Sequence, residues 1–421
     1  MKQYQYMDCK KGKAAFGIFL LAMLLLARDT LVTSCLLGFN KSQFLMLGLI
    51  CVVGAGFLFV RRGEWKQILL DKRMLVIAVS TAVILLPMAI KRDWQMMYFS
   101  ILLCLYFAVF LTYFKSYAEV AKYYVVILSV LAVYSVLVTY VLKFPALDGV
   151  IPVPVFRNST GWKFLNFGLA FAVKDSIWFR NFGIFREPGV YQFFLLLGLY
   201  LNNYAVCWEK QRSLWIVNAI LAVTMVTTFA TGGLIEMALF AVFLYFDKKW
   251  HRTKAGRTGG LIAAAAVLAI AIAIILRMRA GNVIHTVYYE IYDMFLRLFT
   301  QSESLMDRLS SIFIDIRIFF EHPFVGADIA DVLYAIDNNT TSTLILYAIL
   351  GFGGGTLNAA AWAALVWKKE RSVIGNLILL VILFMSFNTQ NLVADVFFWL
   401  FPYMALVERT LPWLENRQKK V

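Results

Sequence analysis

The chain has 421 residues, of which 61% are hydrophobic and only 15% are charged, and its formal net charge is +15. Soluble proteins carry roughly a quarter charged residues, and the mean hydropathy of +0.73 confirms the difference. This composition excludes an ordinary soluble protein of two or three domains. Nucleic acid is not an expected partner, because the basic residues lie in short clusters between apolar runs, as in membrane proteins.

The apolar residues form runs of about 17 to 22, which is long enough to cross a hydrocarbon core of about 30 Å. We therefore predict an all-α polytopic membrane protein with about twelve transmembrane helices in a single integral membrane domain over residues 1–421. The predicted spans lie near residues 14–37, 42–60, 74–90, 96–114, 123–142, 190–208, 214–230, 232–246, 260–276, 341–366, 374–388 and 396–411.

The basic residues indicate the orientation of these spans. A clear majority of the 40 lysines and arginines falls in alternate, short connections and in the two tails. Since cytoplasmic connections carry an excess of lysine and arginine, we place both termini and these connections in the cytoplasm.

Two connections are far longer than two neighbouring helices need. They cover residues 143–189 and 277–340, and the alternation of the spans places both on the outer side. Long loops on a rigid helical scaffold are common places for function.

The first outer loop contains Arg157 and ends in the stretch from Arg180 to Gly189, which includes Arg186 and Glu187. A guanidinium group matches phosphate oxygens bidentately, so arginines at a helix mouth suit an anionic headgroup. The alternative is that these arginines only anchor the loop to lipid phosphates. Within the loop, Phe164 to Val173 is apolar but too short to span, and suits a re-entrant or interfacial segment.

The second outer loop predicts two amphipathic helices, over 286–299 and over 305–321, with the latter ending before Pro323. On the second helix, four polar residues fall on one side at 100° per residue. They are Arg308, Ser311, Asp315 and His322, whereas Arg317 points to a different side. This stripe suits a polar lining, and an exposed helix flank with an Arg–Asp pair is an equal alternative.

Polar residues also precede the span near 341–366, where Asn338 and Asn339 lead into threonines. They either cap the helix or hydrogen-bond sugar hydroxyls. The glycines between 351 and 355 indicate close helix packing. The chain has three histidines and no cysteine in either long loop, so we expect no metal site.

These residues resemble a family. Arg308-Leu-Ser-Ser, the stretch from Phe319 to Gly326, and Asn338-Asn339 before a glycine-rich span are similar to the signature of the bacterial O-antigen polymerase and ligase superfamily. The stretch from Arg180 to Gly189 resembles the Arg-x-x-Gly-x-Phe motif of its earlier loop. The layout of about twelve spans with two outer loops covers nearly the whole chain.

The resemblance implies a glycosyltransferase of the bacterial inner membrane that acts on undecaprenyl-pyrophosphate-linked glycans, without metal or other cofactor and with inversion. Polymerases move a growing chain onto a new lipid-linked repeat, for O-antigen, capsule or a related surface polysaccharide, and a chain-length regulator is a possible partner. Ligases transfer the polymer to lipid A core and carry a histidine before the asparagine. Here Asp337 precedes Asn338, which favours the polymerase branch.

On this reading, arginines stabilise the departing pyrophosphate, and a carboxylate or imidazole accepts the proton of the attacking hydroxyl. The expected catalytic residues are Arg308, His322, Glu187 and Asp315. The expected pyrophosphate- or glycan-binding residues are Arg157, Arg180, Arg186, Arg317, Asn338 and Asn339.

Two other classes of protein remain open. A flippase for lipid-linked oligosaccharides has a similar number of spans, but short loops and charges within its spans are expected. A non-enzymatic membrane assembly or sensor protein requires no arginines at its helix mouths.

Overall fold

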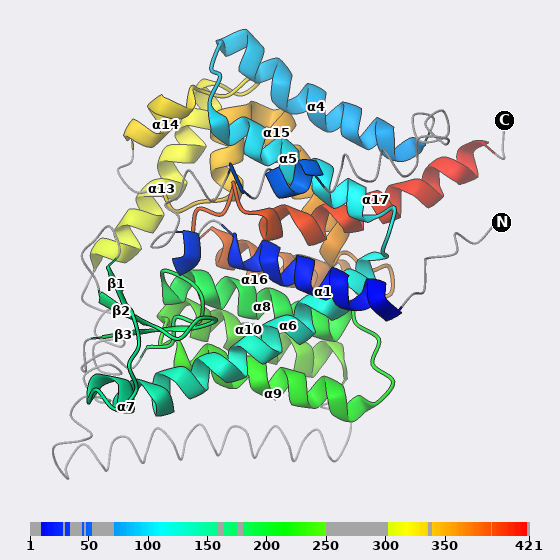
Figure 1. Cartoon of the computed structure of the whole chain (residues 1–421). Helices are drawn as coiled ribbons and strands as arrows, with labels where there is room; N and C mark the ends of the chain where they lie inside the picture. Colours follow the sequence, from blue (N-terminus) through cyan, green and yellow to red (C-terminus); the bar gives the residue numbers. More distant parts are fainter. Residues whose placement is uncertain are drawn as a thin grey trace.

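The computed structural model describes residues 10–27, 30–33, 44–45, 48–52, 71–157, 163–174, 180–249, 302–335, 339–388 and 390–418. The span expected near 260–276, the amphipathic helix expected over 286–299, most of the span near 42–60, and Asn338 lie outside these residues. The described part of the chain is mostly helical (Figure 1).

Each other predicted span overlaps a helix. These helices are α1 (Lys10–Leu25), α4 (Lys72–Lys91), α5 (Met96–Leu111), α6 (Tyr117–Leu137), α8 (Pro188–Tyr204), α9 (Gln211–Thr227), α10 (Thr231–Asp247), α15 (Thr343–Val366), α16 (Val373–Phe387) and α17 (Val396–Gln418). Helix α6 continues through a π-helical turn, η3 (Val138–Leu142), into α7 (Lys143–Leu147). Among the described residues, α4, the continuous helix Tyr117–Leu147 and α15 are long and apolar enough to cross a membrane, and α1, α5 and α16 contain shorter apolar helices.

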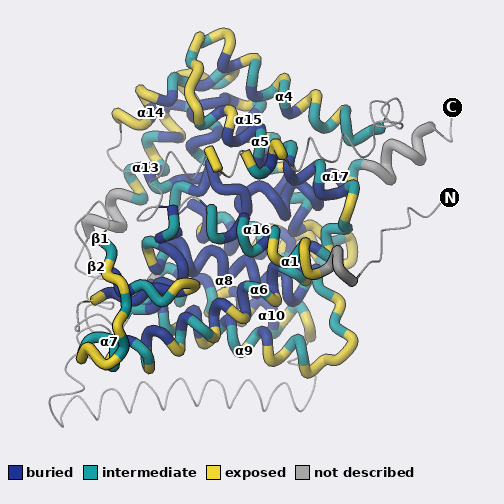
Figure 2. The backbone as a smooth tube through the Cα atoms, in the orientation of Figure 1, coloured by how far each residue is buried: buried dark blue, intermediate teal, exposed yellow. Residues whose placement is uncertain are grey.

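Two helices form the centre of the bundle. Helix α17 packs against α4, α5, α6 and α15, and α8 packs against α6, α9, α10 and α16. Both helices are buried on all sides over most of their apolar length (Figure 2), which is typical of core helices.

The outer helices expose apolar side chains. Leu86 on α4, Val130 on α6 and Ile374 on α16 are 63%, 64% and 70% exposed. Large exposed apolar surfaces are rare on soluble monomers, so this pattern is compatible with helices that face lipid.

A three-stranded antiparallel sheet, β1 (Val155–Arg157), β2 (Lys163–Asn166) and β3 (Phe171–Val173), departs from the all-α prediction. Strands β2 and β3 cover the segment Phe164 to Val173, for which a re-entrant or interfacial segment was expected. The chain reverses at Gly168, whose φ is +85° and whose N–H donates to the Asn166 side chain at 2.8 Å. Strand pairing satisfies the backbone hydrogen-bonding groups of this segment. Its apolar side chains pack on the protein.

Helix α13 (Ser302–Glu321) agrees with the helix predicted over 305–321, and it ends before Pro323 as expected. The turn that follows lies against a kink of α15 at Gly351, where φ is +63° and ψ is −158°. Phe352 N–H donates to Pro323 O at 2.7 Å, and Ala327 N–H donates to Ala348 O at 2.8 Å. A short helix, α14 (Ile329–Ala335), continues from this turn.

The sheet, α7 and the N-terminal part of α13 lie at one edge of the molecule, on the left in Figure 1. The start of α1 and the end of α17 lie toward the opposite edge. The candidate site is built at the first of these two edges.

Candidate functional site

The segment before α8 is fixed to the end of α9. The Arg180 guanidinium donates to the carbonyl oxygens of Thr228 and Phe229, each at 3.2 Å. The N–H of Asn181 donates to Thr227 O at 2.9 Å. A cation at the C-terminal end of a helix satisfies its free carbonyl groups and complements its dipole. Arg180 therefore has a structural function in this edge of the bundle, and its part in pyrophosphate binding stays a prediction.

Gly183 and Phe185, in the same stretch, determine the path of the chain into α8. Gly183 has a φ of +57°, and a Cβ there would lie 2.6 Å from the Tyr191 ring. The Phe185 ring packs at 4.3 Å from that of Phe194 and at 5.4 Å from that of Tyr191. The motif thus forms a rigid entry to α8, which begins at Pro188.

Arg186 and Glu187 lie at the mouth of α8. Arg186 Nη2 is 3.3 Å from Glu187 Oε1, and the two side chains are 40% and 48% exposed. Exposed pairs of this kind contribute at most about 1 kcal/mol to folding. Both groups are therefore accessible to a ligand at little cost in stability.

The polar atoms of three side chains surround Gly232, at the N-terminal end of α10. A Cβ at Gly232 would lie 3.5 Å from Gln192 Nε2, 3.9 Å from Arg308 Nη1 and 3.9 Å from Glu236 Oε1. Gln192 and Glu236 are 2% and 1% exposed, and Gln192 Oε1 accepts from the N–H of Gly233 at 2.9 Å. We refer to Gln192, Gly232, Glu236 and Arg308 as the Arg308 cluster. It joins the first turns of α8 and α10 to α13.

Arg308 is the cation of this cluster. Burial lowers the pKa of its guanidinium, and the carboxylates of Glu236 and Glu187 raise it. Guanidinium stays charged in proteins, so a half-buried cation lies within electrostatic reach of the carboxyl groups of Glu236 and Glu187. The N-terminal ends of α8 and α10 add partial positive charge at the same place. The guanidinium and the helix ends favour an anionic ligand, whereas the nearby carboxyl groups of Glu236 and Glu187 disfavour one.

The sequence analysis did not identify Glu236 or Gln192. A carboxylate inside an apolar run is a signal for function in membrane proteins, and Glu236 stands inside the span predicted over 232–246. That signal was available in the sequence. Gln192 has no comparable signal, because only the packing of α8 against α10 brings it to Arg308.

Asp315 is fully buried, and two side chains of the loop before α15 hold its carboxylate. Asn339 Nδ2 donates to Asp315 Oδ1 at 2.8 Å, and the Thr341 hydroxyl donates to Oδ2. Asn339 Oδ1 in turn accepts from the N–H of Thr341 at 2.9 Å. Asp315 and Asn339 thus fasten this loop to α13.

The pKa of Asp315 predicts a pH-dependent stability. Burial raises the pKa to about 6, against the two hydrogen bonds, which lower it. A carboxyl group with a raised folded-state pKa adds stability when protonated, and this stability is lost as the pH rises through about 6. We expect Asp315→Asn to remove this dependence, since the Thr341 hydroxyl can accept from the new amide and donate to Asn339 Oδ1. Thermal unfolding in detergent between pH 4 and 8 checks this; an unchanged difference between pH 5 and 7 in the variant contradicts it.

The remaining predicted residues lie apart from the Arg308 cluster. A helix rises 1.5 Å per residue, so His322 lies about 20 Å along the axis from Arg308, and it is exposed. The stripe of Arg308, Ser311, Asp315 and His322 therefore does not line one site. Arg317 pairs with Glu321 at 3.7 Å on the exposed side of α13.

Arg157 lies on β1 directly opposite Lys163 on β2, and both are exposed. Like charges in this register repel each other. An anion beside the sheet would relieve this repulsion, which keeps Arg157 a candidate for glycan or phosphate contacts.

Comparison with known proteins gives no match, either to a family model or to a curated protein. Among the described residues, no three histidine, cysteine, aspartate or glutamate side chains are grouped so that they could hold a metal ion.

Proposed function

We propose that this chain polymerises undecaprenyl-pyrophosphate-linked oligosaccharide repeats at the outer face of the bacterial inner membrane. The observation that supports this most is the Arg308 cluster, in which a half-buried guanidinium lies beside Gly232 and Glu236 at the N-terminal end of α10. Such a cation, at the first turns of two helices, suits a pyrophosphate that leaves with negative charge. The apolar helices and the basic residues at the opposite end support placing this edge outside.

In the proposed reaction, an acceptor hydroxyl attacks the anomeric carbon of the growing chain. The bond from this carbon to the pyrophosphate oxygen breaks, and the displacement inverts the anomeric centre. Arg308 and Arg186 neutralise the charge that develops on the pyrophosphate. Pyrophosphate is a good leaving group, so the proton acceptor contributes less than the cations.

The structure changes which residue we propose as that proton acceptor. Both carboxylate oxygens of Asp315 accept hydrogen bonds from neighbouring side chains, and His322 is distant from Arg308. Glu187 is half exposed beside Arg186 and contributes to the charge around Arg308. We propose Glu187 as the acceptor of the proton from the attacking hydroxyl. We propose that Glu236, which is buried, positions Arg308.

The test is elongation by the purified full-length protein, supplied only with undecaprenyl-pyrophosphate-linked repeats and EDTA. A ladder of longer lipid-linked products is the expected result. EDTA removes metal ions but leaves the arginines, which are the proposed cations. A folded protein that forms no ladder contradicts the proposal. Transfer only after lipid A core is added would then identify a ligase, and binding without elongation would identify a transporter or a non-enzymatic protein.

A further inference from the structure

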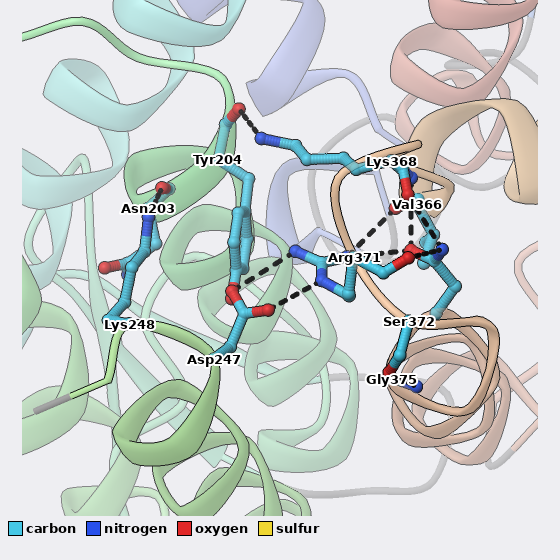
Figure 3. Close-up of polar contacts among 10 residues, drawn as sticks. Asn203, Tyr204, Asp247, Lys248, Val366, Lys368, Arg371, Ser372 and Gly375 are labelled. Atoms are coloured by element: carbon cyan, nitrogen blue, oxygen red, sulfur yellow. Dashed lines mark hydrogen bonds and ion pairs between the residues drawn. The ribbon is translucent and has the colours of Figure 1, made fainter. Parts of the chain in front are cut away.

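At the end of the bundle opposite the Arg308 cluster, three cations converge on one aromatic ring (Figure 3). The distances to the Tyr204 ring centroid are 4.7 Å from Lys248 Nζ, 5.0 Å from Lys368 Nζ and 4.7 Å from Arg371 Cζ. Tyr204 ends α8, Lys248 follows α10, and the other two belong to the connection between α15 and α16. With Asp247, we call these residues the Tyr204 cluster.

One of the three cations is already neutralised. Arg371 Nε is 2.8 Å from Asp247 Oδ1, and the Arg371 side chain is 7% exposed. Asp247 Oδ2 also accepts from the Tyr204 hydroxyl at 2.7 Å. This pair is a fixed part of the protein that fills one side of the Tyr204 ring.

The ammonium groups of the two lysines donate to main-chain oxygens of α8. Lys248 Nζ donates to Asn203 O at 3.1 Å, and Lys368 Nζ donates to Tyr204 O at 3.3 Å. Within the described residues, neither ammonium group lies at ion-pair distance from a carboxylate. Each ammonium has three donors, so both retain donors for a ligand. Their nitrogen atoms are at most about 10 Å apart, since each lies within 5.0 Å of the same centroid.

The positive charges in the Tyr204 cluster repel one another. Burial and the positive charges of Lys248 and Arg371 lower the pKa of Lys368, against the carboxylates of Asp247 and Glu370, which raise it. Burial and Arg371 likewise lower the pKa of Lys248, against Asp247, which raises it. A bound anion would offset both effects.

The connection that carries Lys368 is preorganised. Asn376, which is 1% exposed, accepts from the N–H of Lys368 at 3.1 Å and donates to its carbonyl oxygen at 2.9 Å. It also accepts from Arg371 Nη1 at 3.2 Å. The main chain at Lys368 and the Arg371 guanidinium are therefore held in place before a ligand binds.

Exposed apolar side chains flank the cations. Phe246 lies two residues before Lys248 and is 59% exposed, and Val373, Ile374 and Leu377 follow Arg371 on α16. A free phosphate ion would use the lysines alone. A phospholipid would use both surfaces, with its phosphate on the lysines and its acyl chains on these side chains.

We propose that the Tyr204 cluster binds the phosphate of an anionic phospholipid in the membrane leaflet at this end of the helices. Clusters of lysine and arginine at the cytoplasmic ends of membrane helices attract anionic lipids. The proposal requires that the helices are embedded in a membrane, and it is independent of glycosyl transfer.

The experiment uses the purified full-length protein in detergent, with phosphatidylglycerol, phosphatidylcholine or inorganic phosphate added in separate titrations. Native mass spectrometry counts bound lipid, and thermal unfolding measures the stabilisation. The test variant is the double substitution Lys248→Gln with Lys368→Gln. The control is Lys369→Gln, which removes one exposed charge from the same connection.

Phosphatidylglycerol is expected to bind and raise the unfolding temperature more than phosphatidylcholine does. The double variant should bind it about thirtyfold more weakly, because each lysine near a membrane surface contributes roughly fivefold. Lys369→Gln should keep the wild-type affinity. Equal binding of the two lipids by the wild type, unchanged binding in the double variant, or competition by millimolar inorganic phosphate would each overturn the proposal. The wild-type comparison decides it even if the double variant fails to fold.

Discussion

Arg308→Ala is expected to lower the rate of polymerisation by about a hundredfold or more, because removing one preorganised charge donor from a reacting centre typically has this effect. Arg308→Lys should recover only part of the activity, since an ammonium lacks the planar fork of donors. The rate of ladder formation with lipid-linked repeats measures both. Arg212→Ala is a suitable control, because Arg212 is exposed at the start of α9.

A double substitution separates the role of Glu236 from that of Arg308. If Glu236 acts by positioning the guanidinium, Glu236→Gln should lower the rate in the wild type but add little in the Arg308→Ala background. Groups that act as a unit give such non-additive effects. If cells that carry Arg308→Ala make polymer of unchanged length and amount, the Arg308 cluster has no role in the reaction.

Gly351→Ala should destabilise the protein by about 3 kcal/mol or more, which combines the cost of a left-handed residue with that of overpacking. Gly351 has a φ of +63°, and a Cβ there would lie 2.5 Å from the backbone carbon of Phe324. The turn after α13 would have to leave α15, with loss of the hydrogen bond from Phe352 N–H to Pro323 O. Thermal unfolding and the yield of monodisperse protein in detergent measure this effect.

Gly353→Ala is the matched control for Gly351→Ala. A Cβ at Gly353 meets only the Val83 side chain, at 3.5 Å, and its backbone conformation is ordinary. We expect stability within about 1 kcal/mol of the wild type. Equal losses from the two substitutions would contradict this prediction, because the cost would then not depend on the contact between the turn and α15.

The sequence predicted the helical elements because their signals are local. Uninterrupted apolar runs gave the positions of α4, α5 and α16, and the 3.6-residue period together with Pro323 gave the extent and the end of α13. Short strands carry a weaker signal. The run from Phe164 to Val173 is apolar on either reading, and only the reversal at Gly168 distinguishes a hairpin from an interfacial segment.

The residues of the candidate site were also predicted only in part from the sequence. Arg186 and Glu187 were predicted from their position at a helix mouth, and Arg308 was predicted from the polar stripe on an amphipathic helix and from the family resemblance. The structure places the carboxyl group of Glu187 among the charges that act on Arg308. Sequence periodicity placed His322 and Arg308 on one side of a helix, but it gives the angle around the axis and not the separation along it. Burial and hydrogen bonds to Asn339 and Thr341 made Asp315 a structural residue.

By itself, the sequence determined the apolar, mostly helical character of the chain, the positions of most helices and the clustering of basic residues between them. Tertiary structure alone decided that Glu236 and Gln192 meet Arg308, that Arg180 caps α9, and that Lys248 and Lys368 share one tyrosine ring. The reason is physical: periodicity and capping act over a few residues of one chain segment, whereas these contacts join residues far apart in sequence and depend on how whole helices pack.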